Sequence, residues 1–345
     1  MSNHETYMQM ALELADTNLG QTWPNPTVGA VLVKDGAVIG KGATGRGGRP
    51  HAETEAIAHA AIHNGGADAR GATLYVTLEP CSHQGETGPC VDMIIAAGIT
   101  HVVVATRDPN PKVNGQGIAK LLAAGITVEE GVLGPQAEAV NCGFFSVINR
   151  GRPYVALKLA TSLDGKMATR SGQSQWITGE SAREYTHRLR SRYDALITGV
   201  GTVFADNPQM TVRIPGLESR SPVRVVLDRN GRMPRNARIM QQQEVAPTWV
   251  LTDATVTDAV NTLMGKGITR IMVEAGAGVG SDFLQSGLVD KIYWFRAPII
   301  IGEEGLSAFD GSMPDELAKL ARFAPVQHSV FADDSLDVYL CSPES

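Results

Sequence analysis

One histidine and two cysteines stand in the stretch between Pro50 and Cys90, and they restrict the possible folds more than any other feature. His51 follows Pro50, while Cys81 and Cys90 each follow a proline of their own. A His-Cys-Cys set supplies three ligands for a tetrahedral zinc ion and leaves the fourth position free for a water, which separates catalytic from structural zinc. A fold that uses this set must bring all three residues to one point.

A carboxylate lies close to the first of these ligands. Glu53 stands two positions after His51, in the sequence PHAE. Because it is not needed as a ligand, it can take a proton from a zinc-bound water and pass it to a substrate. H-x-E followed by two P-C pairs is the pattern of zinc-dependent deaminases. The stretch therefore predicts a hydrolytic deaminase site.

The local sequence indicates helices around this site. HAETEAIAHAAIH, which begins at His51, is rich in alanine and has Ile57 and Ile62 for a core. Proline is favoured at the first position of a helix, so we expect both Cys81 and Cys90 at helix N-termini. Free N–H groups and the helix dipole favour a thiolate there.

The two cysteines have two other possible roles. A disulfide between them is disfavoured because the N-terminal residues contain no apolar signal region, so we expect a reducing cytoplasm. A structural zinc would need a fourth ligand, for which His83 is the nearest candidate. A catalytic zinc is favoured over both. His83 is then either a residue of the substrate pocket or a solvated loop histidine, and the sequence leaves this open.

Length and charge limit the remaining possibilities. At 345 residues, the chain is long enough for two domains, and 43% apolar with 19% charged residues is ordinary for a globular protein. The net charge is −6 and the chain contains no basic run, which argues against a nucleic acid as partner. No stretch is apolar and long enough to span a membrane.

The first half of the chain alternates strands with helices. Apolar residues at Met8, Leu12 and Ala15 predict a first helix, and Asp35-Gly36 joins two β-rich runs as a hairpin. Further strands follow short helices that end in Ala-Gly, which indicates an α/β sheet with helices on its faces. Asn25 lies between two prolines, where it either shapes a turn or directs its amide at a ligand.

These motifs resemble the riboflavin-pathway branch of the cytidine-deaminase superfamily over residues 1–146. The resemblance is carried by PHAE, by TLEPCSHQGETGPC, by P-N-P-x-V-G at Pro24–Gly29 and by DPNP at Asp108–Pro111. It implies a three-layer αβα fold and a zinc ion that is bound by the histidine and the two cysteines, with Glu53 as proton shuttle. It also implies substrate contacts from Asn25 and His83. Glu86 is a departure, because relatives often carry Lys or Arg in this loop to meet the substrate phosphate.

The second half predicts another α/β domain, which we place at residues 147–345 because a Gly/Pro turn precedes Pro153. Its strand-and-turn units include a glycine turn at Gly276, Gly278 and Gly280, with Ser281 opening a helix. Bare N–H groups at such a turn can hold a phosphate, although a tight turn without ligand is the alternative. The glycine spacing is not that of a Rossmann fold.

ATSLDGK, G-x-SQWIT, DNP-x-MTVR and VEAG-x-G resemble the dihydrofolate-reductase-like reductase domain of the same pathway. Two sets of residues follow from the resemblance. It implies NADPH at Ala160, Trp176, Thr202, Asp206, Gly276, Ala277, Gly278, Val279, Gly280, Ser281 and Asp282. It implies the phosphorylated substrate at Ser174, Arg190, Met210, Arg213 and Glu274, with Lys158 near the reacting sugar. The two arginines suit a sugar phosphate, since a guanidinium group binds phosphate oxygens in pairs.

Together these resemblances imply a bifunctional enzyme of riboflavin biosynthesis with one zinc ion per chain and NADPH. It would deaminate 2,5-diamino-6-(5-phosphoribosylamino)pyrimidin-4(3H)-one and then reduce the ribosyl side chain to give 5-amino-6-(5-phosphoribitylamino)uracil. We expect small phosphorylated pyrimidines as partners, a homo-oligomer, and no nucleic acid or membrane. One rival is a nucleoside or tRNA deaminase with an unrelated second domain. Another is a zinc-stabilised binding module without activity, in which Glu53 would be dispensable.

Overall fold

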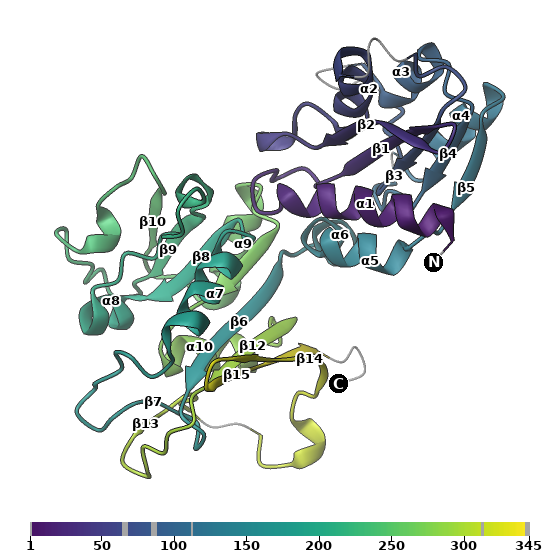
Figure 1. Cartoon of the computed structure of the whole chain (residues 1–345). Helices are drawn as coiled ribbons and strands as arrows, with labels where there is room; N and C mark the ends of the chain where they lie inside the picture. Colours follow the sequence, from purple (N-terminus) through teal and green to yellow (C-terminus); the bar gives the residue numbers. More distant parts are fainter. Residues whose placement is uncertain (1, 64–67, 84–87, 112, 312–313, 342–345) are drawn as a thin grey trace. The chain divides into compact units, whose positions relative to one another are not determined.

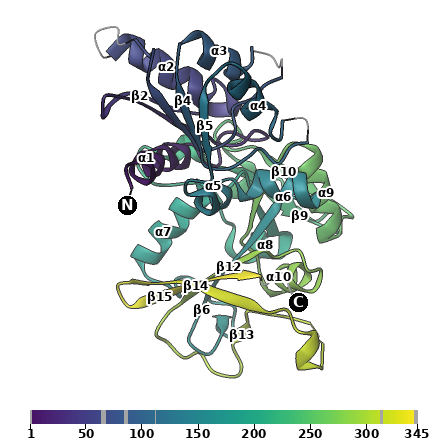
Figure 2. The same cartoon turned by 90° about the vertical axis from the view of Figure 1, so that its right-hand side faces the viewer.

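The computed structural model describes residues 2–63, 68–83, 88–111, 113–311 and 314–341, and it divides the chain into two compact units (Figures 1 and 2). The units are Met1–Gly151 and Arg152–Ser345. The predicted boundary between residues 146 and 147 falls inside helix α6 (Cys142–Arg150), which runs unbroken to the end of the first unit. No helix in the described ranges is both long and apolar enough to cross a bilayer.

The first unit is built on a five-stranded sheet with the order β2-β1-β3-β4-β5. The pairs β1–β2 and β1–β3 are antiparallel, whereas β3, β4 and β5 run parallel. The parallel strands therefore end at one edge, and the segments that follow them meet there. The strands are β1 (Gly29–Lys34), β2 (Ala37–Ala43), β3 (Thr73–Val76), β4 (His101–Val104) and β5 (Thr127–Glu130).

Helices cover both faces of this sheet, as the alternation of buried residues shows. Val31, Tyr75 and Val103 pack against α1 and α5, while their neighbours Leu32 and Leu74 pack against α2, α3 and α4. The predicted three-layer αβα arrangement is therefore confirmed. The helices are α1 (Asn3–Thr17), the 3-10 turn η1 (Arg46–Gly48), α2 (Ala52–His63), α3 (Cys90–Ala96), α4 (Gln116–Ala123), α5 (Gly134–Val140) and α6.

Close backbone contacts hold the start of α2 against the sheet. A Cβ at Gly42 would lie 2.1 Å from the carbonyl oxygen of Ala52, so only glycine fits at this point of β2. The predicted hairpin is present, with Asp35 at φ 51° and Gly36 at φ 76°. The contact with Gly42 places the first turn of α2, which carries Glu53, against β2.

The second unit contains an eight-stranded sheet with the order β10-β9-β8-β11-β6-β12-β15-β14. The first six strands of this order are parallel to one another, and β15 and β14 continue the sheet antiparallel. A separate pair, β7 and β13, lies beside it. The strands are β6 (Tyr154–Thr161), β7 (Lys166–Ala168), β8 (Ala195–Gly199), β9 (Val223–Leu227), β10 (Thr248–Leu251), β11 (Arg270–Val273), β12 (Lys291–Arg296), β13 (Leu306–Ser307), β14 (Phe323–Phe331) and β15 (Asp334–Cys341).

Helices also lie on both faces of the larger sheet. Leu189 of α7 and Val203 of α8 share a core cluster with Leu196 of β8. On the other face, a Cβ at Gly280 of α10 would lie 3.8 Å from Leu157 of β6. The helices and 3-10 turns are α7 (Glu180–Arg190), α8 (Val200–Asp206), η2 (Glu218–Arg220), η3 (Arg238–Met240), α9 (Val256–Gly265), α10 (Ala277–Gln285) and η4 (Leu317–Lys319).

One expected helix start was wrong. Helix α10 begins at Ala277, with Gly276 as its N-cap, so Gly278, Gly280 and Ser281 lie inside the helix instead of in a turn before it. Glycine disfavours a helix, but Gly280 is buried against the sheet, and this packing outweighs the propensity.

Candidate functional sites

His51, Cys81 and Cys90 converge in the first unit, as the spacing predicts. Their ligand atoms all lie within 4.8 Å of one another. The Nδ1 atom of His51 is 3.1 Å from the Sγ of Cys90 and 3.7 Å from the Sγ of Cys81. The three side chains therefore form one cluster of possible metal ligands.

Different elements carry the three ligands. His51 directly precedes α2, and Cys90 is the first residue of α3, with Pro89 in the N-cap position. The expectation of a second helix start at Cys81 was wrong, because Cys81 lies in the irregular segment after β3. Its sulfur still accepts a hydrogen bond from a helix start, since the backbone N–H of Cys90 donates to it over 3.3 Å.

The donor set fits a zinc ion. The side-chain hydrogen bond from the Cys90 thiol, more than the backbone one, lowers the pKa of the Cys81 thiol to about 4, whereas the same thiol–thiol hydrogen bond and burial raise the pKa of Cys90 above its usual range. The side chains alone thus stabilise one thiolate but not two. A cation that prefers sulfur and imidazole ligands completes the charge balance, and zinc is such a cation.

Glu53 lies beside this cluster in the first turn of α2. Glu53 is only 4% exposed, and this burial raises the pKa of its carboxyl group. A hydrogen bond links the carboxyl group to the Cys90 thiol. A buried carboxyl group with a raised pKa is suited to hold a proton and release it during a reaction.

The predicted substrate contacts of the first unit are less uniform. The amide of Asn25 donates to the carbonyl oxygen of Gly47 over 3.2 Å, so it joins two loops near the segment that leads to His51. His83 is exposed, and its charge acts on Asp108. Their roles as substrate contacts stay predictions. Glu86 lies outside the described residues.

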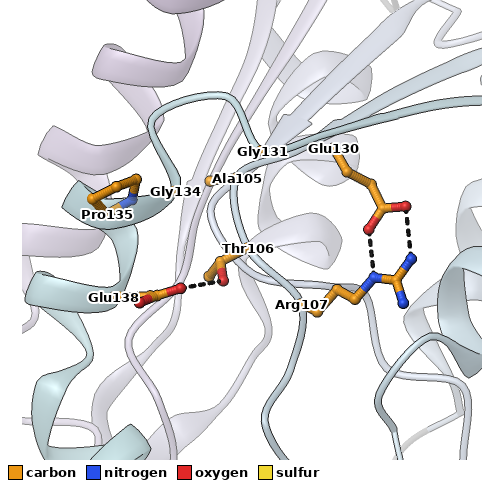
Figure 3. A pocket seen from close by; sticks show the side chains of 8 residues that line it. All are labelled: Ala105, Thr106, Arg107, Glu130, Gly131, Gly134, Pro135 and Glu138. Atoms are coloured by element: carbon orange, nitrogen blue, oxygen red, sulfur yellow. Dashed lines mark hydrogen bonds and ion pairs between the residues drawn. The ribbon is translucent and has the colours of Figure 1, made fainter.

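A shallow pocket of about 370 Å³ opens elsewhere on the first unit, at the ends of β4 and β5 (Figure 3). Arg107 and Glu130 form an ion pair on one side of it, with N–O distances of 2.6 and 3.0 Å, and Glu138 accepts a hydrogen bond from Thr106 on the other side. None of the three possible metal ligands lines this pocket. It is therefore not the candidate metal centre.

In the second unit, Arg190 and Glu274 form a buried ion pair at the centre of the predicted substrate site. The Nε and Nη2 atoms of Arg190 each lie 2.8 Å from a carboxylate oxygen of Glu274. The side chains are 12% and 9% exposed. Burial raises the pKa of Glu274, but the charge of Arg190 and its hydrogen bonds outweigh it and hold this pKa at about 2.

Thr211 and the predicted substrate residue Lys158 also act on this pair. The Nη1 atom of Arg190 donates to the carbonyl oxygen of Thr211 over 3.2 Å, and the charge of Lys158 acts on Glu274. Burial lowers the pKa of Lys158. Glu274 occupies two of the five N–H groups of Arg190 and Thr211 occupies a third, so at most two N–H groups of this arginine are left for a phosphate.

The structure joins several of the predicted cofactor residues. The N–H of Gly276 donates to Thr202 Oγ1 over 3.1 Å, and Ser174 donates to Asp206 over 2.9 Å. Trp176 is 66% exposed.

Two predicted residues of the second unit face its interior instead. Ser281 is 2% exposed, and its hydroxyl accepts a hydrogen bond from the N–H of Asp310. Met210 is 4% exposed, and its side chain belongs to the hydrophobic core. Any contact that Met210 makes with the substrate must therefore come from its backbone, which has a φ of 57°.

Comparisons with known proteins agree with this geometry. Residues 1–106 match the cytidine and deoxycytidylate deaminase zinc-binding region, and residues 153–335 match the RibD C-terminal domain. The riboflavin biosynthesis protein RibD of Aquifex aeolicus is 44% identical over 89% of this chain and 90% of that protein. That of Escherichia coli is 40% identical over 94% of this chain and 96% of that protein. The chain belongs to the RibD family.

A solved RibD-family structure resembles the whole chain. It is the diaminohydroxyphosphoribosylaminopyrimidine deaminase/5-amino-6-(5-phosphoribosylamino)uracil reductase of Thermotoga maritima, with a TM-score of 0.91 and 39% identity, and the match covers 99% of both chains. Family membership confirms the predicted riboflavin branch, with a zinc-dependent deaminase domain before a reductase domain.

Sequence reasoning missed one residue beside the RibD-type zinc centre. Asp108 is 9% exposed, and burial, together with the charges of Glu79 and Cys81, raises its pKa to about 6. The motif DPNP was noted only for the resemblance that it carries. Its place soon after the end of β4 at Val104 is the signal that points to it, because segments that follow parallel strands meet at one edge of the sheet.

Proposed function

We propose that this chain deaminates the diaminopyrimidine ribosyl phosphate of riboflavin biosynthesis in its first unit and reduces the deaminated product in its second. The observation that carries the proposal is the buried Glu53 beside the His51, Cys81 and Cys90 cluster, in one chain with a RibD C-terminal domain. The related protein of Thermotoga maritima is described by both of these activities.

In the first unit, His51, Cys81 and Cys90 would hold zinc, which supplies a Lewis acid that activates water near neutral pH. Glu53 accepts a proton from the attacking water and delivers it to the departing amino group. The carbon–nitrogen bond breaks, ammonia leaves, and a carbonyl group replaces the amine. Burial of Glu53 supports this role, since a carboxyl group with a raised pKa accepts a proton more readily and can return it during the reaction.

In the second unit, NADPH would supply a hydride to C1′ of the opened ribosyl amine, and the chain binds and orients both partners. The resemblance assigns the cofactor to residues that include Trp176, Thr202 and Gly276. Ser174, Arg213 and the pair Arg190–Glu274 would hold the phosphorylated substrate, and Lys158 would lie near the reacting sugar. The hydrogen bond between Ser174 and Asp206 supports a shared site, because it joins a predicted substrate residue to a predicted cofactor residue.

The test follows both reactions in one mixture. Zinc-loaded protein receives the diaminopyrimidine substrate and NADPH, and ammonia and NADPH absorbance are recorded together for the wild type and for Glu53→Ala. We expect the wild type to release ammonia and then consume NADPH. Glu53→Ala should do neither, yet reduce substrate that was deaminated beforehand. Ammonia without any NADPH consumption, even with deaminated substrate, would contradict the reductase half.

Three further expectations stay proposals. A net charge of −6 supports small-molecule partners over nucleic acid. A cytoplasmic location suits the two thiols of the zinc centre, because a reducing compartment keeps them from forming a disulfide. A homo-oligomer remains a prediction that light scattering of the purified protein would test.

A further inference from the structure

Glu79 is a buried carboxylate that the deamination reaction above does not use. It lies two residues before Cys81 and is 3% exposed. Within the described ranges, four backbone amides donate hydrogen bonds to it. Its Oε2 accepts from Gly115 at 2.9 Å and Asp108 at 3.3 Å, and its Oε1 accepts from Gly117 at 2.9 Å and Ile118 at 3.3 Å.

Two of these donors belong to the first turn of α4. The N-cap residue of this helix is Gly115, which has no side chain to accept hydrogen bonds from the exposed N–H groups. Glu79 replaces the missing cap from a distant part of the chain. A negative charge at this position also interacts favourably with the helix dipole.

The contact leaves no space between α4 and the segment before the zinc ligand. A Cβ at Gly117 would lie 2.2 Å from the carbonyl oxygen of Pro80 and 3.2 Å from Glu79 Oε1. Such a distance to a backbone atom cannot be relieved by a rotamer change. The start of α4 is therefore held directly against the peptide that leads into Cys81.

The same carboxylate holds the segment that carries Asp108. The backbone N–H of Glu79 donates to Thr106 over 3.0 Å, and its side chain accepts from the N–H of Asp108. The charges of Cys81 and His83 act on Asp108, so this residue lies close enough to the candidate zinc centre to be affected by it. Glu79 thus ties the segment that carries Cys81 to the segment that carries Asp108.

We propose that Glu79 is a positioning residue for deamination, which holds residues 108–111 and 113–118 against the segment that carries Cys81. These residues then form one wall of the pyrimidine site before the substrate binds. The inference rests on the proposed deaminase function. It differs from the roles of Glu53 and the three ligands, because the hydrogen bonds of the Glu79 side chain go to backbone N–H groups and not to the metal ligands.

The test compares Glu79→Gln with Glu138→Gln. Glutamine keeps the shape of Glu79 but places an NH₂ group against backbone donors. Glu138 is exposed and accepts a hydrogen bond only from the hydroxyl of Thr106 among the contacts described, so its variant controls for loss of a carboxylate near the same strand end. For each protein we would measure KM and kcat for deamination, zinc content, and hydrogen exchange of the Gly115, Gly117 and Ile118 amides.

We expect Glu79→Gln to exchange these amides faster and to raise the KM for the diaminopyrimidine, with kcat/KM falling about 10- to 100-fold because small misplacements of a binding wall are costly. Zinc content should not change, and Glu138→Gln should match the wild type. Faster amide exchange with unchanged KM and kcat would show that Glu79 only caps α4, and this would overturn the inference. Unchanged exchange would overturn it as well. Absence of ammonia release by the wild type would instead refute the proposed function itself.

If Glu79→Gln unfolds the first unit, Gly117→Ala provides the second variant. It leaves the carboxylate intact but forces α4 away from Pro80. The inference expects the same rise in KM at unchanged zinc content. A folded Gly117→Ala protein with wild-type KM and kcat would overturn it.

Discussion

In the first unit, the donor atoms of His51, Cys81 and Cys90 lie within 4.8 Å of one another and form a ligand set for a cation, whereas in the second unit Arg190 and Glu274 already neutralise each other. The first site therefore depends on a group that the chain does not supply. The second depends on a pair that the chain supplies in full. Removing one partner should accordingly have different consequences in the two units.

The largest expected effect is on the site that needs a cation. Cys81→Ser removes one sulfur ligand, so we expect deamination to fall by more than the roughly 10²- to 10⁴-fold that an acid–base group contributes. Reduction of deaminated substrate should continue at the wild-type rate, because the second unit has its own core. Ammonia release and NADPH absorbance, measured separately, check both statements.

Cys142→Ser is the matched control, since Cys142 lies in α6 and is not one of the three clustered ligands. It should retain both activities and its zinc. Equal loss of deamination in both cysteine variants would show that the effect comes from stability and not from zinc.

The two sites also differ in how well the sequence predicts them. His51, Cys81 and Cys90 could be found because few residue types bind zinc and their spacing is characteristic. The partnership of Arg190 with Glu274 joins residues 84 positions apart, and nothing in the local sequence indicates that they bind each other. The resemblance assigned both residues to the substrate, but it did not show that the carboxylate already occupies the guanidinium group.

The wrong expectations have a related cause. The proline before Cys81 predicts a helix start there, and the glycines of residues 276–280 predict that α10 begins only at Ser281. Both are local preferences worth about 1 kcal/mol or less. Tertiary packing decides against such preferences, as the contact of Gly280 with β6 illustrates. Glu79 escaped notice for the same reason, because its backbone donors stand 29 to 39 positions away.

The next largest effect concerns the second unit. Glu274→Gln leaves the buried guanidinium group of Arg190 without its charged partner, which typically costs about 3–5 kcal/mol. We expect the urea midpoint of the second unit to fall and NADPH-dependent reduction to be lost, while ammonia release persists. Fluorescence of Trp249 and Trp294, both in the second unit, reports its unfolding.

An exposed pair in the same unit tests whether burial matters. Glu304 binds Arg170 at 2.7 Å, with side chains 71% and 76% exposed. Because solvent screens such pairs, Glu304→Gln should leave the urea midpoint nearly unchanged. A loss equal to that of Glu274→Gln would mean that burial does not distinguish the two pairs.

The smallest expected effect is a pH dependence beside the buried pair. Burial, with the charges of Arg190 and Arg213, lowers the pKa of His187 from 6.5 to about 4. The unfolded chain therefore binds a proton below pH 6.5, while the folded unit does so only near pH 4. Stability contributed by the neutral ring is present above pH 6.5, declines as the pH falls to about 4, and then levels.

His187→Asn removes this titration while keeping a polar side chain near the carbonyl oxygen of Thr211, which lies 3.1 Å from Nδ1. Urea midpoints of the second unit, measured between pH 7 and pH 4, should fall less steeply in the variant than in the wild type. Glu274 has a pKa of about 2 in the folded unit, so its own loss of stability begins below about pH 4.5 and continues towards pH 2 in both proteins. Identical slopes above pH 4.5 would show that His187 is protonated alike in the folded and unfolded states, and that the neighbouring arginines do not hold it neutral.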